Sequence, residues 1–398
     1  MLKILHMSDE HTREKDIDEA EKCLNFIIET AKKEAVDLIV SAGDWFDSQE
    51  IKLDSKSARL AVRVVSELAD IAPVAIIIGT SSHDGKSPEI LQFARGEYPV
   101  WVASMPEQIF LYHGFFLKSL EGCSDLPAAV ISLIPQPAKQ FFQTNSGIAD
   151  SDQEIGAAMS GLFSGFGVQA EGFGCPHILV GHFNVTGSEL SNGQVRTGMD
   201  IEVSVEQIDF ARPGLVCLGH IHKSQEIGPR SHVFYSGSIY HQNWGELEPK
   251  GFYIHEIDAL GLTSRFIETP AKKLSRFNYD FTEYDVKPLP CEAEGIKGTY
   301  VRLDYKVWQD EAGSIDKDAI TQELLAAGAL DVDIRIVRVP RQNVRSEAVL
   351  KADRLRDKIQ KMAELKEEEV EWSILAKADS LEDMAADELV SAVSGGQI

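Results

Sequence analysis

Short apolar runs alternate with amphipathic segments along roughly the first 268 residues. The runs LKILHM, VDLIVSAG and VAIIIG (residues 2–7, 36–43 and 74–79) have the continuous apolar character of strands that are buried on both faces. Between them, apolar side chains recur at helical spacing near residues 17–35 and 54–70. This alternation predicts an α/β fold in which helices separate the strands of a sheet covered on both faces.

The same pattern continues further along the chain. AAVISLI, HILVGH and LVCLGHIH, at residues 128–134, 177–182 and 215–222, predict three more buried strands. ETPAKKLS, at residues 268–275, has the composition of a connector. The first domain is therefore expected to span residues 1–268.

A smaller domain is expected from 269 to 343. Strand-like segments at 299–308 and 331–340 flank a predicted helix near 316–327, which indicates an α+β unit. From 344 to 398 the chain is highly charged, and two helices with narrow apolar stripes are predicted there.

Acidic residues dominate the composition. The chain has 63 Asp and Glu against 39 Lys and Arg, which gives a formal net charge of −24. A protein that holds DNA by a broad basic face would have the opposite balance. If the substrate is a phosphodiester, bound metal ions, a local basic patch or a partner must supply the positive charge.

The cysteines indicate neither a disulfide framework nor a cysteine-rich zinc site. They are five in number, and no two are spaced as CxxC. We expect buried, reduced thiols.

No apolar run reaches the roughly 18 residues that a membrane span needs, and no signal peptide is evident, so the expected location is the cytoplasm.

Aspartate and histidine side chains follow five of the predicted strands. In an open α/β sheet, ligands bind beyond the carboxyl ends of the strands, so these side chains are expected to converge. One such motif alone is more often a capping group, but five together are improbable as unrelated caps. Their donor atoms suit Mn²⁺, Zn²⁺ or iron. The motifs are Asp9-Glu10-His11, Gly43-Asp44, Ser82-His83-Asp84, Gly181-His182 and Gly219-His220-Ile221-His222.

In this order the motifs resemble the D-x-H, G-D, G-N-H-[DE], G-H and G-H-x-H blocks of the calcineurin-like metallophosphoesterases. Within that family, ILHMSDEH, GDWFDS, LGHIHKSQ and YSGSI resemble segments of SbcD-type DNA repair exonucleases. The resemblance implies a metallophosphoesterase β-sandwich flanked by helices, a small α+β capping domain and C-terminal helices.

The resemblance also implies a two-metal centre, with Mn²⁺ as the expected ion. The implied ligands are Asp9, His11 and His222 for one ion and His182 and His220 for the other, with Asp44 bridging them.

Three residues of the third motif have implied roles of their own. His83 would protonate the leaving oxygen or stabilise the transition state, and Asp84 would orient it. Ser82 stands where the family has an asparagine that binds the second metal. A serine there would be a weaker ligand, so this site would bind metal less tightly.

By resemblance, the activity is that of a DNA exonuclease and endonuclease acting on double-stranded ends with an SbcC-type coiled-coil ATPase. The ATPase would dock on the segment 344–390, and the helices at 17–35 and 54–70 would form a homodimer.

Two alternatives to this function remain open: a phosphoesterase for a small phosphodiester, nucleotide or phosphoprotein, and a catalytically weak subunit that tethers DNA ends. Cations of the capping domain that would contact DNA are Lys272, Lys273, Arg302 and Arg338.

Overall fold

The computed structural model describes residues 1–137, 152–194, 201–258, 260–283, 294–340, 349, 351–366 and 368–383. The chain divides into two compact units. The first contains Met1–Phe277 and two later segments, Leu289–Leu303 and Ile320–Asp333. The second contains the remainder of the chain, from Asn278 onward.

Two mixed β-sheets form the centre of the first unit. The first sheet has the strand order β15-β14-β1-β2-β3-β4, and β1 to β4 run parallel. Because neighbouring strands are parallel, the loops after β1, β2 and β3 leave the sheet at the same edge. The strands are β1 (Leu2–Met7), β2 (Leu38–Ser41), β3 (Val74–Ile77), β4 (Val100–Ala103), β14 (Gly251–Asp258) and β15 (Gly261–Glu268).

The second sheet has the order β12-β13-β11-β8-β7-β5-β6. Here β7, β8, β11 and β13 are parallel, so the loops after β8 and β11 also share one edge. A short parallel pair, β9 (Asn184–Val185) and β10 (Glu202–Val203), lies outside both sheets. The strands are β5 (Glu107–Tyr112), β6 (Phe115–Leu117), β7 (Ala129–Ile134), β8 (His177–His182), β11 (Leu215–Gly219), β12 (Gln225–Ile227) and β13 (Val233–Tyr235).

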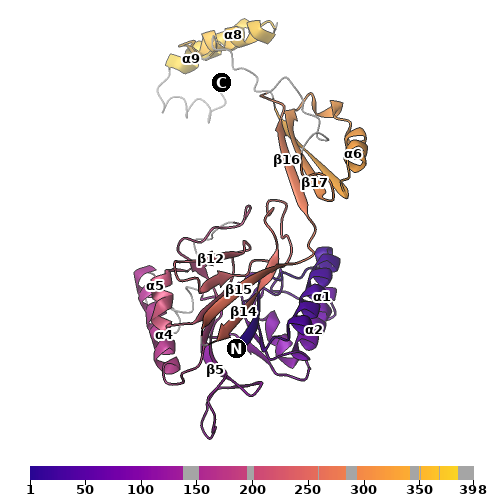
Figure 1. Cartoon of the computed structure of the whole chain (residues 1–398). Helices are drawn as coiled ribbons and strands as arrows, with labels where there is room; N and C mark the ends of the chain where they lie inside the picture. Colours follow the sequence, from indigo (N-terminus) through magenta and orange to yellow (C-terminus); the bar gives the residue numbers. More distant parts are fainter. Residues whose placement is uncertain are drawn as a thin grey trace. The chain divides into compact units, whose positions relative to one another are not determined.

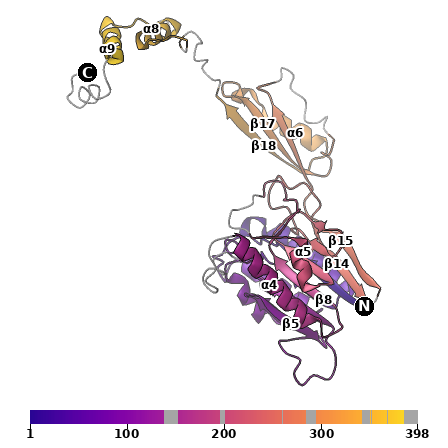
Figure 2. The same cartoon turned by 90° about the vertical axis from the view of Figure 1, so that its left-hand side faces the viewer.

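Helices cover the outer face of each sheet (Figures 1 and 2). α1 (Ile17–Glu34) and α2 (Lys56–Ala69) pack on the first sheet, and α4 (Asp152–Ala170) and α5 (Val205–Ile208) on the second. Ser55 caps the N-terminus of α2, since its side chain accepts a hydrogen bond from the Ala58 amide. Short 3-10 helices occupy Glu14–Asp16, Ser87–Phe93, Asp209–Ala211 and Ala312–Ser314.

The core between the sheets consists of alternate side chains of their facing strands. Ile4, Val40 and Ile77 of the first sheet pack against Ile131 and Val180 of the second, and all five are fully buried. Each such side chain contributes roughly 1.5–3 kcal/mol relative to an exposed position.

The predicted α+β region forms a three-stranded sheet of order β16-β17-β18 with one helix, α6 (Lys317–Ala326). Its strands are β16 (Leu274–Asp280), β17 (Tyr300–Trp308) and β18 (Asp331–Val339). Further on, α8 (Leu355–Lys366) and α9 (Trp372–Asp383) correspond to the two helices predicted in the charged segment. β16 is not among the predicted strands, although Phe277 and Tyr279 alternate with Asn278 and Asp280 in its second half.

The predicted fold class, an α/β protein with a β-sandwich flanked by helices, is confirmed. Both faces of each sheet are covered, as predicted: the other sheet covers the inner face and helices cover the outer one. The apolar strands alone do not distinguish these two kinds of cover, since hydrophobicity does not reveal what packs on a strand. Among the described helices, none has the length and apolarity needed to cross a membrane.

Candidate metal centre

Hydrogen bonds of the backbone amides join the loops after β1, β2 and β11. The amide of Asp9 donates to the Gly43 carbonyl at 2.9 Å, and the amide of His11 donates to the Asp44 carbonyl at 2.9 Å. The amide of His220, at the end of β11, donates to Asp9 Oδ1 at 3.1 Å. Both sheets therefore deliver side chains to one pocket.

Four of the predicted ligands have left-handed backbone conformations that side-chain-bearing residues rarely adopt. Their φ angles are 53° for Asp9, 38° for His11, 62° for Asp44 and 91° for His220. Each such residue costs of order 1–3 kcal/mol, and such costs cluster at functional sites. The backbone is therefore strained at the positions where these side chains converge.

Two glycines allow the strand ends to approach closely. A Cβ atom on Gly79 would collide with the Asp44 side chain and amide, and one on Gly219 would collide with the Ala42 carbonyl. The Gly219 position would also bring a Cβ to 2.9 Å from His182 Nδ1. These two glycines thus make room for the side chains of the proposed ligands.

Asp9, His11 and His222 form the first group of donors. The Nε2 atoms of the two histidines lie 3.1 Å apart, and Asp9 Oδ1 is 3.9 Å from one and 4.0 Å from the other. His11 is buried, and burial holds its pKa well below the usual value. Two imidazoles facing a carboxylate at these distances could hold a divalent cation.

Asp44 lies between this group and a second one. Its Oδ2 is 3.7 Å from His11 Nε2 and 3.3 Å from His182 Nε2. His182 Nδ1 donates to the Ala42 carbonyl at 2.6 Å, which directs Nε2 towards Asp44. Burial lowers the pKa of His182, but the Asp44 carboxylate outweighs burial and raises it to about 9. A cation bound between the two residues would replace that proton.

His220 lies beside the second group. Its ring centroid is 5.1 Å from that of His182, and its Nε2 lies 3.1 Å from Asn184 Nδ2. Gln194 holds this loop from the other side, since its Oε1 accepts from the His222 amide at 3.2 Å. Sequence reasoning missed Asn184 and Gln194, because neither belongs to a strand-end motif.

The structure corrects the role expected for Ser82. Ser82 is exposed, whereas Thr80 Oγ1 lies 3.0 Å from Asp44 Oδ2 and 3.2 Å from His182 Nε2. The amides of His83 and Asp84 both donate to the Thr80 carbonyl, so a turn takes up Ser81 and Ser82. Thr80, rather than Ser82, is therefore the residue of this loop whose side chain lies beside the second group.

Asp84 also differs from its expected role. Its carboxylate accepts the backbone amides of Asp44, Phe46 and Gly79 at 2.8–3.0 Å, and its described hydrogen bonds do not include His83. Burial, with the nearby Asp44 charge, raises its pKa to about 7. Asp84 thus fixes the loop that carries Asp44.

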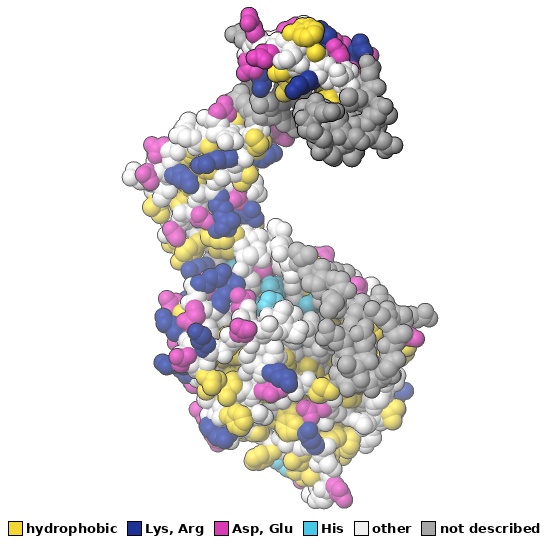
Figure 3. Space-filling view, turned by 180° about the vertical axis from the view of Figure 1, so that it is seen from behind, with side chains coloured by type: hydrophobic (Ala, Val, Ile, Leu, Met, Phe, Trp, Pro, Cys, Tyr) yellow, Lys and Arg dark blue, Asp and Glu magenta, His cyan; other side chains and the backbone are white. Residues whose placement is uncertain are grey.

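His83 lies at the edge of the pocket. Its ring meets that of His11 edge-on at a centroid distance of 4.8 Å. Its Nδ1 is buried and has no hydrogen-bond partner among the described residues. Figure 3 shows histidine side chains reaching the molecular surface, and His83, His220 and His222 are all partly exposed. A substrate atom can therefore reach this edge.

A second set of contacts fixes His222. Glu246 Oε1 accepts from His222 Nδ1 at 2.8 Å, and Glu246 Oε2 pairs at 2.7 Å with the ammonium of fully buried Lys250. Burial raises the pKa of Glu246, but His222 and Lys250 outweigh it and lower the pKa to about 2. An ionised carboxylate behind an imidazole is a common support for metal-binding histidines. Sequence reasoning missed Glu246 because it lies well beyond the end of β13 and in none of the strand-end motifs.

The four predicted DNA-contacting cations differ in exposure. Lys272, Lys273 and Arg338 are exposed, and Lys272 lies over the Tyr300 ring. Arg302 is buried: its Nε donates to Asp333 at 2.8 Å, and its guanidinium lies 4.3 Å from the Trp244 ring centroid. This arrangement corrects the expectation for Arg302, because its charge is already paired and shielded.

The chain is similar to known phosphoesterases and nuclease subunits. The family model for calcineurin-like phosphoesterases matches residues 2–224. The SbcD component of the SbcCD nuclease of Staphylococcus saprophyticus is 25% identical over 69% of this chain and 70% of its own length. The same component from Escherichia coli K12 is 24% identical over 64% of this chain, and the match spans 64% of its length, less than two thirds.

Two solved structures also align with the chain. GAP50, the anchor in the inner membrane complex of Plasmodium, aligns with a TM-score of 0.46 and 19% identity over 68% of this chain and 85% of its own. A dimetal phosphatase from Danio rerio aligns with a TM-score of 0.39 and 10% identity over 67% of this chain and 99% of its own. With the family model matching more than half of its residues, the chain belongs to the calcineurin-like phosphoesterases.

Proposed function

We propose that the chain is a metal-dependent DNA nuclease, the hydrolytic subunit of a complex with an SbcC-type ATPase. The observation that carries the proposal is the meeting of Asp9, His11, Asp44, His182 and His222 in one pocket, from strands of both sheets. The two SbcCD relatives support DNA as the substrate class. We further propose Mn²⁺ as the ion, double-stranded ends as the site of action, and a homodimer formed through α1 and α2.

The donor set fits two divalent ions. Asp9, His11 and His222 would hold one, His182 and His220 the other, and Asp44 would contact both. Carboxylate and imidazole donors in this mixture suit Mn²⁺. Two such ions, when bound, supply an activated water and neutralise charge on the phosphoryl group. They also place positive charge inside a strongly acidic protein.

The chain's own residues would handle the proton. His83 lies beside His11 and is partly exposed, so we propose that it protonates the leaving oxygen. Asp84 acts indirectly by holding the amides of Asp44 and Gly79.

Three substrates test this proposal. With Mn²⁺, the purified chain should degrade linear blunt duplex DNA faster than covalently closed circular duplex. Cleavage of only a chromogenic phosphodiester would instead identify an enzyme for small substrates. Cleavage of none of the three, with metal bound, would identify a tethering subunit.

Thr80 provides a prediction about metal affinity. Thr80→Val removes the hydroxyl that lies beside Asp44 and His182, so the Mn²⁺ concentration for half-saturation should rise roughly 10-fold or more. The matched control is Ser82→Ala, which should leave it unchanged because Ser82 is exposed. Calorimetric Mn²⁺ titration distinguishes the two. A larger effect from Ser82→Ala would identify Ser82, not Thr80, as the residue that supports the second ion.

Docking of the ATPase is proposed for residues 344–390, of which 344–348, 350, 367 and 384–390 lie outside the described residues. Within it, α8 and α9 are linked by an ion pair between Arg356 and Asp379 and present Trp372 at 75% exposure. Ending the chain at Pro340 should abolish co-purification with the ATPase while leaving Mn²⁺-dependent cleavage of the chromogenic diester intact. Undiminished co-purification would refute the assignment.

A further inference from the structure

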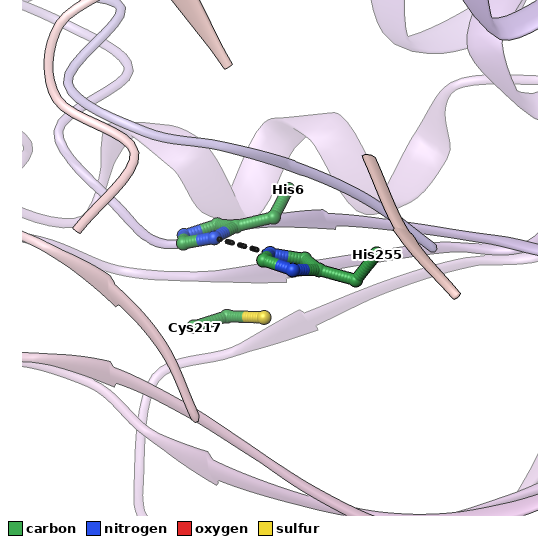
Figure 4. A group of neighbouring side chains, drawn as sticks. All are labelled: His6, Cys217 and His255. Carbon is green, nitrogen blue, oxygen red and sulfur yellow. Dashed lines mark hydrogen bonds between the residues drawn. The ribbon is translucent and has the colours of Figure 1, made fainter. Parts of the chain in front are cut away.

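Three potential metal donors meet in the apolar core between the two sheets. His6 lies on β1 and His255 on the neighbouring β14, while Cys217 lies on β11 of the opposite sheet. All three are fully buried, and one donor atom from each lies within 4.8 Å of the others. Figure 4 shows the two imidazoles facing each other above the thiol. None of the three is a proposed ligand of the pocket described above.

Each histidine is held through the nitrogen that faces away from the other ring. His6 Nε2 donates to the Leu218 carbonyl at 3.1 Å, so its Nδ1 carries a lone pair. His255 Nδ1 lies 2.7 Å from the Ser264 hydroxyl, which can either donate or accept. His6 Nδ1 and His255 Nε2 therefore face each other at 3.3 Å, each with its opposite nitrogen anchored. Anchoring of this kind is typical of metal-binding histidines.

We propose that His6, Cys217 and His255 form a separate site for one thiophilic d¹⁰ cation, Cu⁺ or Zn²⁺. One thiolate and two imidazoles form a soft donor set, unlike the carboxylate-rich pocket at the strand ends. The cation would link the two sheets across their shared core.

The proton balance of binding is simple. Before binding, the Ser264 hydroxyl donates to His255 Nδ1, and His255 Nε2–H donates to His6. On binding, the His255 proton moves to Nδ1 and is accepted by Ser264, and the Cys217 thiol releases its proton to solvent. One proton thus leaves for each cation bound.

Burial favours the monovalent ion. Burial holds the pKa of both histidines well below the usual value, to about 3 for His6, and raises that of the Cys217 thiol. With one thiolate, Cu⁺ leaves the site neutral, whereas Zn²⁺ leaves one positive charge in an apolar core. We therefore expect Cu⁺ to bind more tightly than Zn²⁺.

Metal analysis of the full chain tests the site. The protein is expressed in medium supplemented with copper or with zinc, purified under reducing conditions and saturated with Mn²⁺ to occupy the carboxylate-rich pocket. We expect copper to approach one ion per chain and zinc to bind at lower occupancy. X-ray absorption at the metal edge should show one sulfur ligand with nitrogen ligands. This measurement requires no variant, so it stands even if a substitution prevents folding.

The matched variants are Cys217→Ser and Cys23→Ser, both at fully buried thiols. Cys217→Ser should lose the ion, and Cys23→Ser should retain it. The site is overturned if neither metal is retained, if the bound metal has no sulfur ligand, or if both variants retain it equally. Loss of DNA cleavage with the sulfur-ligated ion present would refute the nuclease proposal and leave this site unaffected.

Discussion

Asp44→Asn should abolish DNA cleavage and weaken Mn²⁺ binding more than any other single substitution in the pocket. Asp44 Oδ2 lies between His11 Nε2 and His182 Nε2, so its charge would be shared by both ions. Changing a residue that merely supports a ligand costs roughly 10–100-fold in affinity or activity. Removing a charge that both ions share should reduce affinity and activity by more than that range. Calorimetric Mn²⁺ titration and the blunt-duplex assay measure the two effects.

The matched control for Asp44→Asn is Asp125→Asn. Asp125 is exposed, pairs only with His113 among its described contacts, and belongs to neither group of donors around the pocket. It should retain full activity and full Mn²⁺ stoichiometry. A thermal unfolding scan of Asp44→Asn checks that the fold survives. Near-normal cleavage by Asp44→Asn would contradict the assignment of Asp44 as the shared ligand.

His83→Ala should reduce cleavage by roughly 10²–10⁴-fold, the range typical of general acid–base catalysis. Metal binding should change little, because His83 lies at the edge of the pocket and is not a proposed ligand. His83→Ala should thus reduce cleavage without weakening Mn²⁺ binding, whereas Asp44→Asn should reduce both. The assay is Mn²⁺-dependent hydrolysis of blunt duplex DNA, with Mn²⁺ affinity measured in parallel.

His113→Asn provides the control for His83→Ala. His113 is an exposed histidine with a left-handed backbone, which asparagine tolerates. The His113→Asn protein should cleave blunt duplex DNA and bind Mn²⁺ as the unmodified chain does. A His83→Ala protein that cleaves a diester with a good leaving group almost normally, yet fails on DNA, would support proton donation to the leaving oxygen. Equal loss on both substrates would contradict that role.

The strand ends could be predicted because two independent patterns coincide there. An apolar run ends, and a glycine followed by aspartate or histidine begins, as at Gly43-Asp44 and Gly219-His220. Parallel strands then require these residues to share an edge, which the structure shows for β1 with β2 and for β8 with β11. Local sequence and sheet topology are sufficient for this much of the site.

The remaining features depend on contacts that sequence spacing does not encode. Thr80, not Ser82, contacts Asp44 because the chain turns between Thr80 and His83, and the spacing from His83 does not reveal that turn. Glu246 reaches His222 from the loop between β13 and β14, well beyond the end of β13. Arg302 is paired with Asp333, a partner 31 positions along the chain.

A single pocket that holds two divalent ions between strands of both sheets is the centre of the proposed function. Anomalous diffraction at the manganese edge, from crystals of the full chain grown with excess Mn²⁺, measures this directly. We predict two peaks, one beside Asp9, His11 and His222 and one beside His182 and His220, with Asp44 between them. An absence of peaks in a pocket with these side chains in place would contradict the proposed nuclease centre.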